Sequence, residues 1–137
     1  MDLFDILYAR KMAGSGGSGF PIAVDISDLT WENVTGNDVT GEIDSPRNDR
    51  LSCTDYVDIP ANAAVFMADI EGSNNQGFYH FTYFYGDKDF ISGTGWVQNG
   101  TAETIPNGTK TLRIGLKKSD GANINKQELE TAIITFR

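Results

Sequence analysis

Residues 78–85 read FYHFTYFY, and this run decides the fold class of the chain. Successive side chains of a β-strand point to opposite faces, so positions 79, 81, 83 and 85 share one face and positions 78, 80, 82 and 84 share the other. Aromatic side chains stand on both faces, which is typical of a strand that is buried on both sides. The run therefore predicts a central strand that is covered from one side by a second sheet.

Segments on both sides of this run carry the same two-residue alternation. In residues 111–117, Leu112, Ile114 and Leu116 are expected to point inward and Arg113 outward. Residues 64–70 and 132–136 alternate in the same way, and a shorter run contains Val39 and Ile43. Residues 125–129 are expected to form one helical turn.

Turn chemistry separates these runs. Residues 59–63 (IPANA), 72–77 (GSNNQG) and 86–89 (GDKD) are rich in Gly, Pro, Asn and Asp, and we interpret the second of them as a hairpin loop. About eight or nine short strands with turns roughly every 8–12 residues predict an all-β chain folded as an antiparallel β-sandwich. Residues 57–64 and 103–110 each contain a strand, an Ile-Pro turn and a second strand, and two such corners would suit a jelly roll.

The first nineteen residues differ from the rest of the chain. Apolar side chains recur at helical spacing near the start, with acids before them and Arg10 and Lys11 after them, a polarity that complements a helix dipole. So short a helix is marginal alone in water, and the following GSGGSG stretch behaves as flexible coil. We therefore expect an anchor that docks on another protein through Leu3, Phe4, Ile6, Leu7 and Tyr8.

The expected organisation is an anchor helix or peptide over residues 1–13, a Gly/Ser linker over 14–19 and a β-sandwich (jelly-roll) domain over 20–137. Two alternatives stay open for the leader: a capping helix on its own domain, or a vector-derived tail. A secretory signal is disfavoured because the positive charges follow the apolar run. A membrane span is excluded because the run is too short, so no membrane partner is expected.

The composition of the chain argues against several classes of partner and metal site. The chain has 137 residues and a formal net charge of −8, which disfavours nucleic acid as a partner, because phosphate binding needs a basic face. Cys53 is the only cysteine and His80 the only histidine, so an internal disulfide and a thiolate metal site are excluded, and a histidine-based zinc site is not expected. We expect Cys53 to be a small buried side chain.

Catalysis is not expected. Cys53 and His80 lie in separate strand-like runs, and the chain has no G-x-S-x-G nucleophile motif. A glycosidase-type carboxylate pair stays open, because the chain has nineteen acidic residues. Asp87 and Asp89 alternate in an acidic turn and are the candidates for a structural calcium, although Asp is favoured in exposed turns anyway. We expect no cofactor.

Sugar binding is the remaining chemistry, because aromatic faces stack on sugar rings and planar polar groups hold hydroxyls. Trp96 follows Gly95 in a loop-like stretch and is the best platform in the sequence. Tyr83, Tyr85 and Arg113 are candidates to assist it. Aromatic residues of a sandwich are more often core, and we expect Trp31 to be core.

Two stretches resemble the small jelly-roll domains of bacteriophage virion proteins and related carbohydrate-binding modules. They are FYHFTYFYGDKDFISGTGW (residues 78–96) and ETIPNGTKTLRIGLKKSDGANINKQEL (residues 103–129). The shared pattern is a strand ending in Tyr-aromatic-Tyr, an acidic turn with Phe-Ile-Ser, and a later Ile-Pro turn into another strand. The leader is also similar to the openings of small phage structural proteins.

The resemblance implies a non-enzymatic virion protein, such as a capsid decoration, head fibre or tail component. It would be assembled in the bacterial host cytoplasm, contact other virion proteins through its leader, form homo-oligomers and display its domain for attachment to host-surface glycans. The alternatives are a free carbohydrate-binding module without a virion role, and an accessory domain of a lyase or hydrolase.

Overall fold

The computed structural model describes residues 19–73 and 77–137, and every statement below concerns those residues. The expected anchor over residues 1–13, with Leu3, Phe4, Ile6, Leu7 and Tyr8, lies outside the described residues, as does the Gly/Ser linker up to residue 18.

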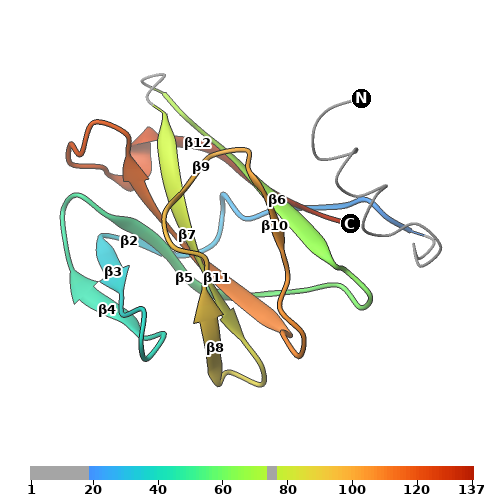
Figure 1. The fold of residues 1–137 in the computed structure, drawn as a ribbon. Coiled ribbons are helices and arrows are strands. Elements are labelled where there is room, and N and C mark those ends of the chain that lie inside the picture. The colour runs from blue at the N-terminus through green and yellow to red at the C-terminus, as the bar shows by residue number, and fades with distance from the viewer. Residues whose placement is uncertain (1–18, 74–76) are drawn as a thin grey trace.

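The described residues form strands, one 3₁₀ turn and no α-helix, so the expectation of an all-β chain is confirmed (Figure 1). The elements are β1 (Ile22–Asp25), β2 (Trp31–Glu32), β3 (Val34–Gly36), β4 (Ile43–Pro46), β5 (Leu51–Asp58), β6 (Val65–Gly72), β7 (Phe78–Tyr85), β8 (Phe90–Gly93), β9 (Val97–Gln98), β10 (Ala102–Thr104), β11 (Thr111–Lys118), η1 (Lys126–Glu128) and β12 (Leu129–Phe136). No helix in this part of the chain has the length and apolar character needed to cross a membrane.

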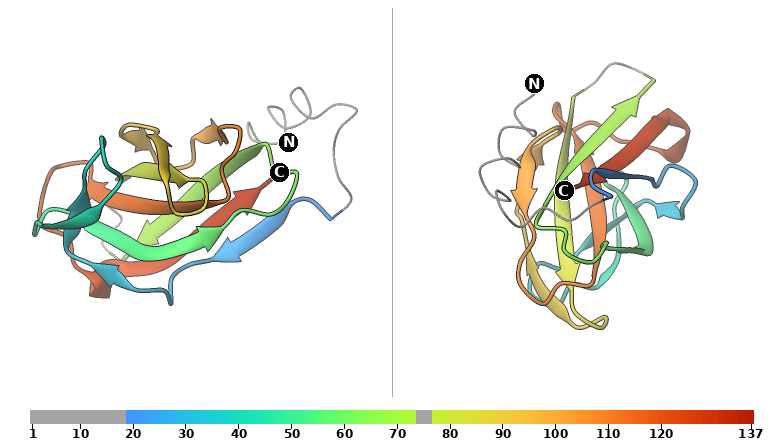
Figure 2. Two further views of the ribbon diagram at one scale, coloured as in Figure 1. Left: turned by 90° about the horizontal axis from the view of Figure 1, so that it is seen from below. Right: turned by 90° about the vertical axis from the view of Figure 1, so that its right-hand side faces the viewer.

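The strands form two larger sheets and a small hairpin, with every pairing antiparallel. Sheet A has the order β1-β12-β6-β10, and sheet B has the order β2-β5-β11-β7-β8, with β9 also paired to β7. Strands β3 and β4 pair with each other as a separate hairpin. The arrangement is sandwich-like, with the core between the two sheets (Figures 1 and 2).

Both sheets contribute to one hydrophobic core. Phe66 of sheet A meets Phe84 of sheet B edge to face, with ring centroids 5.7 Å apart. Leu112, Ile114 and Leu116 of β11 are fully buried in this core, as the alternation predicted. The other buried members are Ile26, Trp31, Leu51, Cys53, Val57, Ala68, Ile70, Phe78, Ile105, Ile124, Ala132, Ile134 and Phe136, which confirms the expectations for Trp31 and Cys53.

Strand β7 is buried on both faces, as its sequence predicted. Phe78 and Phe84 face the main core. Phe81, Tyr83 and Tyr85 lie on the outer face of sheet B and form a second cluster with Ile43 of β4. The main core between the two sheets covers one face of β7, and the β3–β4 hairpin covers much of the other. Sequence alone predicted the first cover and not the second.

The two Ile-Pro turns have the same geometry. In residues 60–63 and 106–109, the backbone N–H of the fourth residue donates to the proline carbonyl, at 3.2 and 3.3 Å. The third residue of each turn has a left-handed backbone, Asn62 with φ 70° and Gly108 with φ 82°. Asn and Gly are the residues that adopt this conformation at least cost, so the same local chemistry specifies both turns.

The two corners also bind each other. The N–H of Ile59 donates to the carbonyl of Lys110 at 2.9 Å, and the N–H of Ile105 donates to the carbonyl of Ala64 at 2.9 Å. These are equivalent positions of residues 57–64 and 103–110. The similarity between the two segments therefore corresponds to a local two-fold relationship in the structure. Each corner carries the chain from one sheet to the other.

Two local predictions were wrong. Residues 72–77 do not close a hairpin, because β6 belongs to sheet A and β7 to sheet B. Gly- and Asn-rich loops suit both kinds of connection, so their composition does not separate them. Val39 is 79 % exposed in the loop between β3 and β4, and Ile43 alone belongs to a strand. The turns at 86–89 and at η1 were predicted correctly.

Candidate functional site

The best candidate for a ligand site is a pocket of about 260 Å³ on the outer face of sheet B. The hairpin of β3 and β4, the loop before β5, strand β7 and the loop after β8 all reach it. We call it the Trp96 pocket; it is lined by Thr35, Gly36, Asp38, Arg47, Arg50, Phe81, Tyr83 and Trp96. Its size suits one ring-shaped ligand group rather than a large ligand.

Aromatic rings form one side of the pocket. Phe81 and Tyr83 stack with centroids 4.5 Å apart, and Trp96 stands edge-on to Phe81 at 5.7 Å. Tyr83 is only 3 % exposed, because its ring lies directly under Gly36. A Cβ at position 36 would overlap that ring, so the close approach of the hairpin requires glycine there. Burial raises the pKa of Tyr83 to about 12, so its hydroxyl stays neutral.

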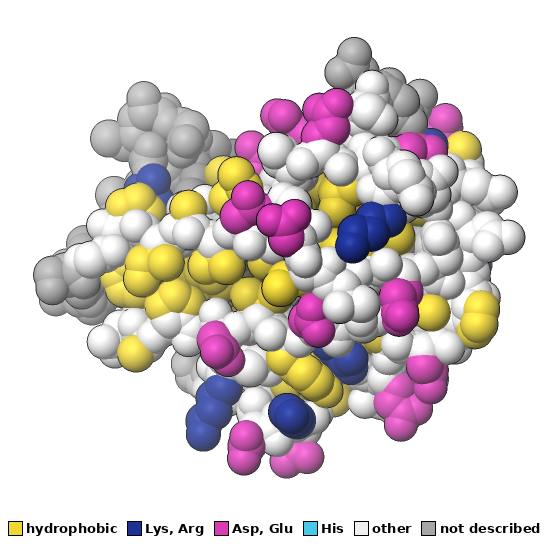
Figure 3. All heavy atoms as spheres, turned by 180° about the vertical axis from the view of Figure 1, so that it is seen from behind, with side chains coloured by type: hydrophobic (Ala, Val, Ile, Leu, Met, Phe, Trp, Pro, Cys, Tyr) yellow, Lys and Arg dark blue, Asp and Glu magenta, His cyan; other side chains and the backbone are white. Residues whose placement is uncertain are grey.

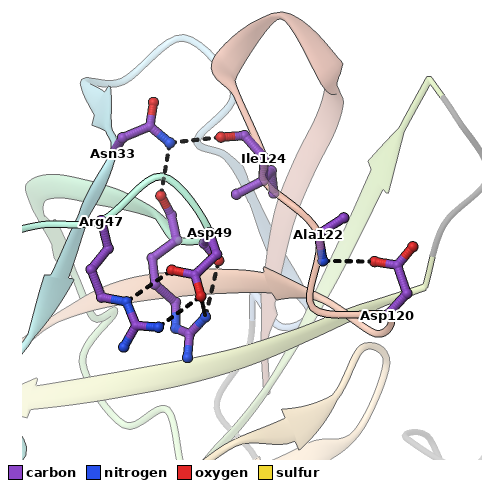
Figure 4. Close-up of polar contacts among 7 residues, drawn as sticks. Asn33, Arg47, Asp49, Asp120, Ala122 and Ile124 are labelled. Atoms are coloured by element: carbon purple, nitrogen blue, oxygen red, sulfur yellow. Dashed lines mark hydrogen bonds and ion pairs between the residues drawn. The ribbon is translucent and has the colours of Figure 1, made fainter.

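Two arginines on one aspartate form another side of the pocket (Figure 4). Arg47 donates to both carboxylate oxygens of Asp49, from Nε at 2.8 Å and from Nη2 at 2.7 Å. Arg50 approaches the same carboxylate through Nη1 at 3.0 Å. The hydrogen bonds from Arg47 lower the pKa of Asp49 below its ordinary value. The carboxylate therefore orients both guanidinium groups.

Asn33 fixes the loop that carries these arginines. Its side-chain amide donates to the carbonyl of Arg50 at 2.9 Å and to the carbonyl of Ile124 at 2.6 Å (Figure 4). The second contact links the loop to the segment before η1, where Asp120 accepts a hydrogen bond from the N–H of Ala122 at 2.9 Å. The basic side of the pocket is thus held by residues distant in sequence.

Trp96 also contacts two cationic side chains. The guanidinium of Arg50 lies 5.1 Å and the ammonium of Lys117 lies 4.5 Å from the indole centroid, within the range of cation–π attraction. Because Leu51 pairs with Leu116 in the sheet, the residues next to this pair, Arg50 and Lys117, are neighbours. No ion pair joins Lys117 to another residue of the described ranges.

Positive side chains gather around the Trp96 pocket. The chain has a net charge of −8. On the face seen from behind in Figure 3, basic side chains lie among acidic ones. Arg47, Arg50 and Lys117 lie around the Trp96 pocket, and Arg113 and Lys88 lie over the ring of Tyr56.

Tyr85 and Arg113 belong to a different arrangement. Tyr85 is 1 % exposed, and its hydroxyl donates to the carbonyl of Gly41. Arg113 donates from Nη2 to the same carbonyl at 2.9 Å and from Nε to the Tyr85 hydroxyl at 3.1 Å. Its guanidinium lies over the Tyr56 ring at 4.4 Å. These contacts hold the loop between β3 and β4 against sheet B.

The structure therefore divides the four residues expected to bind sugar. Trp96 and Tyr83 line the pocket, whereas Tyr85 and Arg113 support the hairpin beside it. Sequence reasoning missed Arg47, Arg50 and Lys117. Two arginines flanking one aspartate are visible in residues 47–50, but nothing in the sequence connects that loop to Trp96.

The acidic turn at Asp87 and Asp89 is a tight, exposed turn. The N–H of Gly86 donates to the carbonyl of Asp89 at 2.8 Å, and Lys88 takes the left-handed φ of 68°. Lys88 places its ammonium 5.6 Å from the Tyr56 ring centroid. Within residues 19–73 and 77–137, no three His, Cys, Asp or Glu side chains gather in a way that could hold a metal ion.

The two residues considered for nucleophilic chemistry are both in the core. Burial raises the pKa of the Cys53 thiol to about 11, which keeps it protonated. Burial lowers the pKa of His80 to about 4, and neither ring nitrogen has a hydrogen-bond partner. Neither residue lines the Trp96 pocket. No protein-family model, curated protein sequence or solved structure matches this chain.

Proposed function

We propose that this chain is a non-enzymatic structural protein of a bacteriophage virion, and that its domain binds host-surface glycans in the Trp96 pocket. Residues 1–13 anchor it to the capsid or tail, and the linker lets the domain project. Several copies on a symmetric particle add avidity to weak individual contacts.

The observation that carries this proposal is the separation between the attachment end and the pocket. Ile22 pairs with Phe136, so the start of the described domain lies beside its C-terminus. The β3–β4 hairpin, which borders the pocket, lies toward the opposite end (Figure 1). A domain tethered ahead of β1 would therefore present the pocket outward.

The strand order supports a jelly roll as the finer description of the fold. Strands β1-β12-β6-β10 face β5-β11-β7-β8, with β2, β9 and the β3–β4 hairpin as additions. Jelly rolls arrange eight strands in two such sheets and occur in viral capsid and lectin domains. The order agrees with the resemblance to virion and carbohydrate-binding jelly rolls that the sequence suggested.

The chemistry of the pocket supports a saccharide as ligand. Trp96 offers partly exposed ring surface beside the buried Tyr83, while Arg47 and Asp38 add polar groups on other sides. A free carbohydrate-binding module is the second candidate, because the pocket is formed without residues 1–18.

Deletion of residues 1–19 separates the two candidates. The deletion ends before Phe20, which packs against the core, so the domain keeps its fold. Full-length and shortened chains would each be expressed during assembly of the phage particle, and particles would be isolated by sedimentation. We expect the full chain to sediment with particles and the shortened chain to stay in the supernatant while retaining glycan binding.

A matched variant sharpens the test. Replacing Leu3, Phe4 and Leu7 by Asp keeps the chain length but removes the apolar surface, and should also abolish particle association. Sedimentation of both altered chains with particles would contradict the anchor. If the full chain binds glycans but never joins a particle, the free binding module is the better description.

A further inference from the structure

We infer that the Trp96 pocket selects acidic saccharides, with the sugar ring beside Trp96 and its carboxylate bound by Arg50 and Lys117. This inference rests on the proposed glycan binding and names the class of glycan. A neutral sugar would offer only hydroxyl groups to Arg50 and Lys117, whereas a carboxylate would accept charge-assisted hydrogen bonds from them.

The first argument is the unused donor capacity at the indole. Arg50 uses Nη1 for Asp49, with the side-chain oxygen and the backbone carbonyl each 3.0 Å away. Within the described ranges its Nε and Nη2 have no hydrogen-bond or ion-pair partner, and neither does the ammonium of Lys117, which contacts only aromatic rings. A carboxylate accepts charge-assisted hydrogen bonds from such groups, which are roughly twice as strong as neutral ones.

The second argument is the local charge balance. Around the pocket, Arg47, Arg50 and Lys117 supply three positive charges, and Asp38 and Asp49 supply two negative ones. The site is therefore positive on a protein whose net charge is −8. An acidic ligand is therefore attracted to this site although the protein as a whole is negatively charged.

The third argument is preorganisation. The Arg50 side chain is 15 % exposed and is held by Asp49 and by the Trp96 ring. The register of β11 places the backbone of Lys117 beside β5 and β7, and its ammonium lies 4.5 Å from the Trp96 centroid and 5.8 Å from the Tyr79 centroid. Little side-chain freedom is lost on binding at such a site, so a single carboxylate can discriminate between ligands.

The test compares each acidic glycan with its own neutral form. The full chain would be titrated with a panel of bacterial capsular polysaccharides that contain hexuronate, each beside its carboxyl-reduced form. We expect binding to hexuronate polysaccharides that is at least about tenfold weaker after reduction. The difference should shrink between 50 mM and 500 mM salt, because screening weakens exposed charge pairs (roughly a 10 Å Debye length at 0.1 M).

Three variants and one control locate the effect. Arg50→Gln and Lys117→Gln should each lower affinity for the native polysaccharide about tenfold, and the preference for the native over the carboxyl-reduced form should shrink in each variant. Trp96→Ala should weaken both forms. Lys110→Gln removes an exposed lysine away from the pocket and should change neither. Circular dichroism of each variant confirms that it is folded.

The outcomes distinguish the two proposals. Equal binding of native and reduced polysaccharides, with loss of both in Trp96→Ala, would overturn the selection for acids and leave glycan binding intact. Absence of binding to every polysaccharide in the panel would overturn glycan binding itself and the inference with it.

Discussion

The Nη2 atom of Arg113 lies 2.9 Å from the carbonyl oxygen of Gly41, across 72 residues of sequence. The contact joins the middle of strand β11 to the loop between β3 and β4. That loop includes Asp38, which lines the Trp96 pocket, so a residue that does not contact the pocket helps to position its edge.

Replacing Arg113 by Ala should destabilise the domain. The guanidinium donates to Gly41 and to the hydroxyl of the buried Tyr85, and loss of such charged hydrogen bonds costs about 1.5–3 kcal/mol. Urea unfolding followed by fluorescence measures the free energy of unfolding. The control is Lys117→Ala, which removes another outward cation of β11 that makes no hydrogen bond to the hairpin. An equal loss in both variants would contradict the special role of Arg113.

The free energy of unfolding should depend on the protonation of His80. Its pKa in the folded chain is lowered to about 4 by burial, against 6.5 when exposed. Between pH 6.5 and pH 4, His80 is therefore protonated in the unfolded chain and neutral in the folded chain. The contribution of His80 to the free energy of unfolding is fully present above pH 6.5. It falls by about 3 kcal/mol as the pH drops to 4 and then stays constant.

The measurement is urea unfolding at pH 7 and pH 4.5 for the natural chain and for His80→Leu. The variant should lose less stability over this interval, because it has no group there to protonate. Subtracting the two curves removes the contribution of the carboxylates, including Glu103, whose pKa is raised by burial. Identical pH profiles for the two proteins would show that His80 is accessible to protons in the folded state.

Cys53 should be unreactive in the folded chain. It is fully buried, and its raised pKa of about 11 leaves almost no thiolate at pH 8. A chromogenic disulfide reagent should therefore modify no thiol in native buffer and one thiol per chain in guanidinium chloride. Rapid modification of the native protein would contradict the burial of this side chain.

Asn99 should be sensitive even to a nearly isosteric change. Its side chain accepts from the N–H of Ile70 at 2.9 Å and donates to the carbonyl of Ile70 at 3.0 Å, next to the step from β9 in sheet B to β10 in sheet A. Asn99→Asp keeps the shape but loses the donor, and we expect a loss of about 1–3 kcal/mol in unfolding free energy. Asn107→Asp, in an exposed turn, is the matched control and should have little effect.

The sequence predicted those parts of the fold that depend on local pattern. Burial is visible in the sequence where it depends on side chains of a single strand. Examples are the aromatic residues on both faces of residues 78–85 and the alternation of Leu112, Ile114 and Leu116. The Ile-Pro turns were recognisable because Pro restricts φ at the first position of the turn and Asn or Gly tolerates the left-handed backbone at the third.

The predictions that failed depend on pairing between distant segments. The loop at 72–77 has the composition of a hairpin, but which sheet each neighbouring strand joins is decided by β11 and β12. Arg113 was correctly expected to point outward, yet the hairpin that covers it is more than sixty residues earlier. The meeting of Trp96 with Arg50 and Lys117 arises from the same long-range register, so only one of the three was a candidate beforehand.

The reciprocal hydrogen bonds between Ile59 and Lys110 and between Ile105 and Ala64 have a consequence for how this domain can vary. They lie just outside the turns, so a longer tip at Ala61 or Asn107 would leave the frame of the sheets in place, and loop closure becomes only slowly more costly with length. Foreign peptides grafted into either tip would be presented on the frame that these two bonds hold, and neither tip lines the Trp96 pocket.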